Sequence, residues 1–496
     1  MSIIHNKDKS VLTAQDLIDD KYIPQTAKEA LGANILSIYN RYRTSGFSKE
    51  ESLAKLFPDV VLSEEVLESI VTGILSGNHL LFFGPPGSGK TLVAKSIWKL
   101  FPKEVHVVAD CPVQDDPMSL VDEKFWKIAP PCPFCKNKYG NAEGIDFHPD
   151  LVDPENVPVK KITLKEGVGF ARIQGSSEVF PDHLTGQINL HKLEKVGDPN
   201  NPLVLEPGKL LQANRGILVI DEIGKLPYGT QNVMLQALEE GIVTPSKSRE
   251  TFPAMFFAVT TSNIEDLDNI NQPLIDRFSN IYIDFPQAHY MNMSIINVNI
   301  LNKKTRNGPM LIKEISSLIV EDWRKKYSTH PELEEICSNR TLSDILDRII
   351  SYSIINNGVL LPDRKDIYEG VMDALKTRIR ARSIISYNES VQTLEQYLKN
   401  NMENIIAIAA KRVWCDYFTN SLKSNKEEGD NTIAEVNRIV NDTTMQEEIK
   451  QSKDKFPRIR ALGEYLKNID HMDIDSAFYG IWFAKYIKGL EEKKCD

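Results

Sequence analysis

Eight consecutive residues have the types and spacing of a phosphate-binding loop: Gly84, Pro85, Pro86, Gly87, Ser88, Gly89, Lys90 and Thr91. The glycines let backbone N–H groups surround phosphate oxygens where side chains would clash, and the start of a following helix adds partial positive charge. Lys90 can reach the β and γ phosphates of a nucleotide, and the Thr91 hydroxyl can bind Mg²⁺. These residues predict a nucleotide site; the alternative is a Gly-rich turn that binds none.

Two carboxylates, Asp221 and Glu222, follow four apolar residues at positions 217–220. Ligands of α/β proteins bind at the carboxyl ends of parallel strands, and this pair would emerge at such an end. Asp221 would hold the Mg²⁺ ion, and Glu222 would orient and deprotonate the water that attacks the γ phosphate. Many strands end in acids, so the prediction of hydrolysis depends on this motif together with the phosphate loop.

Two further polar residues have the character that phosphate hydrolysis needs. Asn263 ends another apolar stretch, where its amide could hydrogen-bond the attacking water, although Asn also forms turns. Arg277 stands beside an apolar pair in the sequence Leu274-Ile275-Asp276-Arg277-Phe278. Arginine is suited to stabilising charge on a transferring phosphoryl group. The alternative for Arg277 is a surface ion pair with Asp276.

The elements that must position these residues alternate between strands and helices. The predicted strands cover 79–83, 104–109, 216–220 and 254–260, and the predicted helices between them cover 91–100 and 231–240. This alternation indicates an α/β fold with a parallel sheet covered on both sides. From about residue 290 onward the pattern is helical, with a clear apolar helix face at Leu342, Ile345, Leu346, Ile349 and Ile350.

The length of 496 residues allows about three structural units. We expect a helical N-terminal region over 1–60, an α/β core over 61–290, a helical region over 291–385 and a further helical region over 386–496. Within the core, residues 111–168 change character and form an inserted segment, because they are too many for a simple connection.

Charge and composition exclude several classes of protein. With 59 basic and 69 acidic residues the net charge is −10, which makes binding of nucleic acid over the whole surface unfavourable. Six cysteines, four of them isolated, do not form a disulfide framework. Neither a signal peptide nor a stretch long enough to span a membrane is recognisable. We therefore expect a cytoplasmic protein with no membrane span.

These motifs, in this order, resemble the AAA+ ATPases. Gly84–Thr91 looks like their Walker A motif, Ile217–Glu222 like Walker B, and Asn263 like sensor 1. Residues 170–175 and 206–216 are similar to the branch that contains magnesium-chelatase ATPase subunits and MoxR proteins. The resemblance covers about residues 60–385. It implies a P-loop AAA+ core followed by an α-helical lid, an insert in the second core helix at 185–205, and a hairpin over 240–249 before sensor 1.

The resemblance also implies an ATPase that works as a ring, most often a hexamer. Arg277 is proposed as the arginine finger that acts on ATP in the neighbouring subunit. Arg340 looks like sensor 2, with Arg364 as the competing candidate. Members of this branch commonly work with a partner that carries a von Willebrand A domain, which this chain shows no sign of containing. A separate protein partner is therefore implied.

Cys132 and Cys135 depart from the family pattern and lie in the inserted segment. The spacing Cys-Pro-x-Cys is typical of a zinc knuckle, in which two thiolates from one tight turn bind the same ion. The ion would need Cys111 together with His148 or another histidine as its remaining ligands, or two subunits would have to share it. The alternatives are a redox or metal-transfer role and a pair of reduced cysteines without metal.

The function that fits best is a ring ATPase that remodels or activates a partner protein, with insertion of a metal cofactor as one form of that role. The alternative is a motor stimulated by nucleic acid, with Lys247 and Arg249 at the tip of the hairpin contacting phosphates. A kinase resembling the PrkA proteins is a third interpretation, but no protein-kinase catalytic loop is visible.

Overall fold

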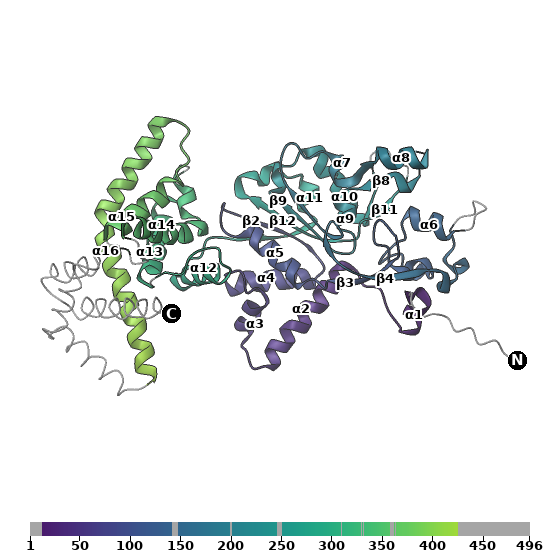
Figure 1. Ribbon diagram of the computed structural model, residues 1–496, viewed down its shortest axis with the longest axis horizontal. Coiled ribbons are helices and arrows are strands. Elements are labelled where there is room, and N and C mark those ends of the chain that lie inside the picture. The colour runs from purple at the N-terminus through teal and green to yellow at the C-terminus, as the bar shows by residue number, and fades with distance from the viewer. Residues whose placement is uncertain are drawn as a thin grey trace, which may run out of the picture. The chain divides into compact units, whose positions relative to one another are not determined.

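The computed structural model describes residues 12–140, 147–198, 201–245, 250–308, 310–328, 330, 332–357, 362 and 364–424 (Figure 1). The chain divides into two compact units, Met1–Asp284 and Phe285–Asp496, and each is described by itself. The predicted residues Lys247 and Arg249 lie outside the described residues.

A six-stranded parallel sheet forms the centre of the first unit. Its strand order is β13-β2-β12-β9-β6-β5. The strands are β2 (His79–Gly84), β5 (Lys165–Glu166), β6 (Gly169–Gln174), β9 (Ile217–Asp221), β12 (Phe257–Asn263) and β13 (Phe278–Tyr282). Strands β2, β12 and β9 are buried almost throughout, as strands covered on both faces must be. This sheet confirms the predicted α/β fold.

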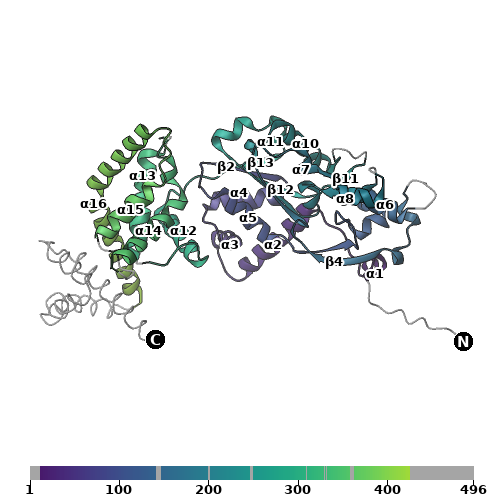
Figure 2. The ribbon, with the colours of Figure 1, turned by 45° about the horizontal axis from the view of Figure 1, so that its top comes forward.

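Alternate side chains of these strands enter two separate cores. Leu80 and Phe82 of β2 pack in a cluster with α2, α3, α4 and α5, whereas Leu81 packs on the opposite face with α7, α9, α10 and α11. Both views show helices on the two faces of the sheet (Figures 1 and 2). The helices are α2 (Ala27–Thr44), α3 (Lys49–Leu56), α4 (Glu64–Leu75), α5 (Lys90–Leu100), α7 (Pro181–Thr185), α9 (Lys209–Gln212), α10 (Tyr228–Glu240) and α11 (Gln272–Ile275).

The start of α3 follows the capping pattern of the sequence. The Glu51 amide donates to Ser48 Oγ at 3.1 Å, and the Ser48 amide donates to a Glu51 carboxylate oxygen at 2.8 Å. Each side chain thus satisfies a backbone donor that the first helical turn leaves unpaired. The predicted strand over 254–260 corresponds to β12, which begins at Phe257; Ala254 instead bonds to Gly241 beside the preceding hairpin.

Three strands form a second sheet outside the parallel one. The order is β1-β4-β3, with β1 at Leu12–Thr13, β3 at Glu104–Val108 and β4 at Pro158–Thr163, and both pairings are antiparallel. The strand that follows the phosphate loop helix in sequence therefore does not join the central sheet. The connection from β3 to β4 contains α6 (Pro133–Tyr139), and α1 (Ala14–Asp19) lies near β1. In its described part, this connection also contains the 3₁₀ turns η1 (Pro117–Leu120), η2 (Glu123–Phe125), η3 (Pro149–Leu151) and η4 (Pro154–Asn156).

Two small hairpins interrupt the core where the resemblance places them. Between α7 and α9 the chain forms β7 (Gly186–Ile188), α8 (Leu190–Val196), η5 (Pro202–Val204) and β8 (Leu205–Pro207), with β7 and β8 antiparallel. Before β12, β10 (Ile242–Val243) pairs antiparallel with β11 (Phe252–Pro253). Two further 3₁₀ turns, η6 (Ile223–Lys225) and η7 (Ile264–Asn269), follow β9 and β12.

The second unit is helical in the part that the structure describes. Its elements are α12 (His289–Leu301), α13 (Met310–Tyr327), η8 (Glu334–Cys337), α14 (Asn339–Asn357), α15 (Arg364–Lys376) and α16 (Ile384–Ser424). The predicted apolar face of α14 is fully buried in their common core. No described helix has the length and apolar character that a membrane crossing requires.

A substitution at Gly216 tests how closely the backbone before β9 approaches β6 in the central sheet. A Cβ atom at Gly216 would lie 1.6 Å from the Gly169 carbonyl oxygen of β6, so we expect Gly216→Ala to destabilise the protein by about 3 kcal/mol. Gly229 is the control, since a Cβ there meets nothing within 4 Å on the exposed start of α10. Calorimetry should show a lower melting temperature for Gly216→Ala and an unchanged or slightly higher one for Gly229→Ala. Equal melting temperatures would contradict the packing.

Candidate functional site

The register of the central strands brings the predicted motifs to one edge of the sheet. Asn263 of β12 pairs with Gly84, the last residue of β2, and Thr260 of β12 pairs with Ile220 on β9. On the other side of β9, Asp221 pairs with Gln174, the last residue of β6. The carboxyl ends of four adjacent strands therefore meet at the place where α/β sheets bind ligands.

The phosphate loop joins β2 to α5 through a backbone that only glycine adopts easily. Gly84, Gly87 and Gly89 have φ values of 154°, 79° and 107°. A Cβ at Gly84 would lie 2.1 Å from the Ile283 carbonyl oxygen, so this position also needs glycine for space. α5 begins at Lys90, with Thr91 in its first turn. Its first backbone N–H groups thus belong to the loop that would surround the phosphates.

Lys90 is folded back onto the loop. Its Nζ donates to the Gly84 and Pro85 carbonyl oxygens at 2.9 and 2.7 Å, and the residue is 8% exposed. The ammonium group thus donates to neutral carbonyl oxygens of the loop. Phosphate oxygens are charged and accept stronger hydrogen bonds, so they can take the place of these carbonyls. Lys90 is therefore positioned for the predicted contact with the β and γ phosphates.

Asp221 is buried and paired with a cation. Its Oδ2 accepts from Arg172 Nε at 2.7 Å, and its Oδ1 accepts from the Thr261 hydroxyl at 3.4 Å. The Asp221 side chain is 2% exposed and that of Arg172 is 37% exposed. A buried carboxylate needs such a partner, because isolated burial of its charge is costly.

Glu222 has an unusual backbone for its residue type. Its φ of 56° lies in the left-handed region, and its amide donates to Thr261 Oγ1 at 3.0 Å. The carboxylate accepts from Gln174 Nε2 at 3.0 Å and pairs with Lys225 at 3.0 Å. The turn separates the two adjacent carboxylates, so that Asp221 points into the protein and Glu222 remains partly accessible at the edge.

The sequence did not identify three of these contact residues: Arg172, Gln174 and Thr261. Arg172 and Gln174 alternate along β6, so they share one face of that strand. An Arg and a Gln two positions apart at the end of a strand are a weak signal, and only the pairing of β6 with β9 brings them onto the two carboxylates.

Arg277 lies at the opposite edge of the sheet. It immediately precedes β13, whose first residue, Phe278, pairs with His79 at the start of β2. Gly84 is five residues further along β2, which corresponds to about 16 Å. Arg277 pairs with Glu239 at 2.9 Å, rather than with Asp276, and its side chain is 37% exposed.

The two sensor 2 candidates belong to the second unit. Arg340 is an exposed residue in the first turn of α14, and Arg364 is the first residue of α15. The choice between them stays a prediction.

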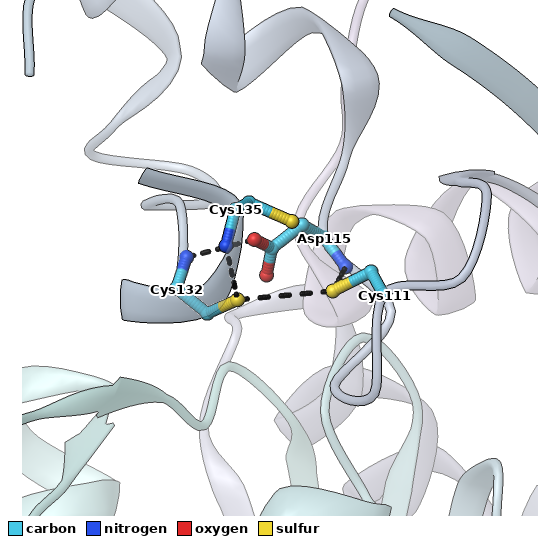
Figure 3. A group of neighbouring side chains, drawn as sticks. All are labelled: Cys111, Asp115, Cys132 and Cys135. Carbon is cyan, nitrogen blue, oxygen red and sulfur yellow. Dashed lines mark hydrogen bonds between the residues drawn. The ribbon is translucent and has the colours of Figure 1, made fainter. Parts of the chain in front are cut away.

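The cysteines of the inserted segment form a group separate from this edge. Sγ atoms of Cys111, Cys132 and Cys135 and a carboxylate oxygen of Asp115 all lie within 4.8 Å of one another (Figure 3). Burial, and next the Cys111 thiol, raise the pKa of Asp115 to about 8. His148 is exposed just before η3 and is not part of the group, so Asp115 takes the place that the sequence left open.

Two protein-family models match parts of the chain. The profile of the family "Magnesium chelatase, subunit ChlI" matches residues 57–109, and that of the "ATPase family associated with various cellular activities (AAA)" matches residues 155–279. The chain is 22% identical over 367 residues to magnesium-chelatase subunit ChlI of Euglena gracilis, covering 69% of this chain and 95% of the relative. These matches support an AAA+ ATPase of the magnesium-chelatase branch.

Other similar proteins carry related names. A ChlI homolog of Methanocaldococcus jannaschii is 23% identical, covering 70% of this chain and 83% of the relative. Among solved structures, a complex of the magnesium-chelatase subunits BchI and BchD is similar with a TM-score of 0.33 and 19% identity, covering 68% of this chain and 98% of that chain. NtrX from Brucella abortus is similar with a TM-score of 0.32 and 16% identity, covering 76% of this chain and 71% of that chain.

Substitutions at two positions of the site should affect ATP binding and ATP turnover separately. We expect Lys90→Ala to weaken ATP binding at least about tenfold, because the loop loses its phosphate-binding ammonium group. Glu222→Gln should bind ATP with nearly unchanged affinity and lose at least about 100-fold in turnover, because the amide cannot accept a proton from water. Nucleotide titration and phosphate release measure the two effects.

Lys95→Ala is the matched control, since Lys95 lies exposed on the same helix α5. It should leave both binding and turnover at wild-type values. If Glu222→Gln released phosphate as fast as the wild type, Glu222 would not be the base, and another group would have to activate the water.

Proposed function

We propose that this ATPase works as a closed ring of identical subunits, with a hexamer as the expected size. The observation that carries the proposal is the position of Arg277, which lies at the sheet edge opposite to the phosphate loop of its own subunit. An arginine about 16 Å away along β2 is too far to reach a γ phosphate bound there. A head-to-tail neighbour would bring its Arg277 to that site, and repeated contacts of this kind close into rings.

The ion pair of Arg277 suits such a role. Both partners are exposed, with 37% of the Arg277 side chain and 58% of the Glu239 side chain accessible. Exposed pairs of this kind contribute at most about 1 kcal/mol. Arg277 can therefore leave Glu239 at little cost when a phosphate of the adjacent subunit becomes available.

The residues at the sheet edge fit ATP with Mg²⁺. The Thr91 hydroxyl in the first turn of α5 and the Asp221 carboxylate at the end of β9 are oxygen ligands of the type that Mg²⁺ prefers. When bound, Mg²⁺ would neutralise charge on the phosphates. Lys90 moves from the loop carbonyls onto the phosphates, Asn263 orients the attacking water, and Glu222 accepts its proton.

The work done with this ATP is the remodelling or activation of a separate partner protein. The relatives are named as subunits of magnesium chelatase, which supports action on a partner rather than alone. Because those relatives are named after a magnesium chelatase, we expect this activity to include insertion of a metal cofactor into the partner. A partner with a von Willebrand A domain and a cytoplasmic location belong to the same proposal.

An assembly test examines whether Arg277 acts between subunits. Arg277→Ala and Glu222→Gln should each hydrolyse ATP at a small fraction of the wild-type rate. Mixed in equal amounts, they should recover activity, because roughly a quarter of the interfaces then combine an intact Glu222 with a neighbour's Arg277.

The control for this test mixes Arg277→Ala with the double variant Arg277→Ala/Glu222→Gln, which contributes no arginine. This mixture should stay inactive. If the first mixture also stayed inactive while one variant co-purified with an affinity-tagged copy of the other, Arg277 would not act on the neighbouring subunit.

The Glu222→Gln variant, which should bind ATP without hydrolysing it, can be used to identify the partner protein. Glu222→Gln, purified from its own host with ATP and Mg²⁺, should retain a protein in fixed ratio, identified by mass spectrometry. Lys90→Ala purified in parallel is the control and should retain little of it, because it cannot hold the ATP state. Nucleic acid released by salt, without a protein, would instead indicate a nucleic-acid motor and contradict the proposal.

A further inference from the structure

The cysteine group has the dimensions of a tetrahedral metal site. The Sγ atoms of Cys111 and Cys132 lie 3.8 Å apart, and each pair of ligand atoms in the group lies within 4.8 Å. Two thiolates bound to one zinc ion at about 2.3 Å in tetrahedral geometry stand about 3.8 Å apart. A disulfide would need about 2.05 Å, and all three cysteines are free.

Asp115 contributes an acceptor that the protein leaves unused. The residue is 2% exposed, and its buried Oδ1 accepts no hydrogen bond from any residue that the structure describes. Its Oδ2 accepts from the Cys132 amide at 2.7 Å, which fixes the carboxylate against α6. Buried carboxylate oxygens without a partner are rare because their desolvation is costly, so this oxygen itself points to a missing ligand.

Backbone amides are directed at two of the sulfur atoms. The Asp115 amide donates to Cys111 Sγ at 3.3 Å, and the Cys135 amide donates to Cys132 Sγ at 3.4 Å (Figure 3). Such N–H groups favour the thiolate, which is the form that binds metal. Cys132 immediately precedes α6 and Cys135 lies in the first turn of this helix, so the Cys135 amide is directed at Cys132 Sγ.

The Cys111–Asp116 loop is held in place independently of any metal. Asn214 Nδ2 donates to the Val113 carbonyl oxygen at 2.6 Å, and Arg215 pairs with Asp116 at 2.6 Å in a fully enclosed ion pair. Asn214 and Arg215 come just before β9, the strand that ends in Asp221. Two ligands, Cys111 and Asp115, are thereby fixed to the central sheet.

We propose that Cys111, Asp115, Cys132 and Cys135 bind one structural zinc ion. The ion joins the loop after β3 to the start of α6 within the inserted segment. That segment is built mostly of short turns, so a cross-link between its two parts replaces a larger apolar core. The site is independent of the Mg²⁺ at the ATP edge and does not depend on the proposed ring.

The donor set selects the metal. Three sulfur ligands and one oxygen in a tetrahedral arrangement suit Zn²⁺, whereas Mg²⁺ and Ca²⁺ require six or more oxygen ligands. All four positions are filled by protein side chains, with no place left for a substrate or a reactive water. A closed site of this kind is structural rather than catalytic.

The test is the zinc content of the full-length protein after exhaustive dialysis, measured by mass spectrometry of the metal. The wild type should hold about one zinc per chain. Cys132→Ser and Asp115→Asn should each weaken zinc binding at least about tenfold. Cys337→Ser, which changes another buried cysteine, and His148→Ala should keep the wild-type zinc content.

A second measurement does not depend on the folding of any variant. Wild-type protein stripped of metal and titrated with Co²⁺ should develop thiolate-to-cobalt charge-transfer bands and the visible bands of a tetrahedral ion, saturating at one equivalent. A wild type without zinc and without these bands would overturn the proposal. So would a disulfide between two of the three cysteines found by thiol counting, or a Cys132→Ser variant with full zinc content.

Discussion

The parallel pairing of β2, β12 and β9 is the constraint on which the ATP site depends. The strand pairing fixes Asn263 beside Gly84 and Thr260 beside Ile220. None of these residues can therefore shift unless its whole strand moves. A slip of one residue would exchange the two cores, because Leu80 and Leu81 pack on opposite faces. The positions of the site residues are thus determined by apolar packing far from the phosphates.

The same parallel arrangement underlies the proposal that Arg277 acts on a neighbouring subunit. Parallel strands place all their carboxyl ends at one edge, and Arg277, before the first residue of β13, must lie at the other. Within the first unit no change of side-chain rotamer moves it across the sheet. An arginine that acts on phosphate from this position requires a second subunit, and the interface then follows from strand direction.

The sequence predicted the parts of this site that have local signals. Gly84–Thr91 and the apolar run before Asp221 are each contained in one stretch of chain. The contacts made by Arg172 and Thr261 were not predictable, because they cross from one strand to another over 40 residues or more. Strand β3 was predicted as an element, but its antiparallel pairing with β4 depends on residues more than 50 positions away.

The cysteine group shows the same division between local and distant information. Cys132 and Cys135 are three residues apart and predict a turn that binds metal, whereas the role of Asp115 depends on Asn214 and Arg215, about 100 residues later. Their hydrogen bonds hold the ligand loop against the residues that start β9, which ends in Asp221. Loss of the metal would therefore loosen a segment packed beside the catalytic strand, and the ATP site would respond through the position of β9 rather than through any direct contact.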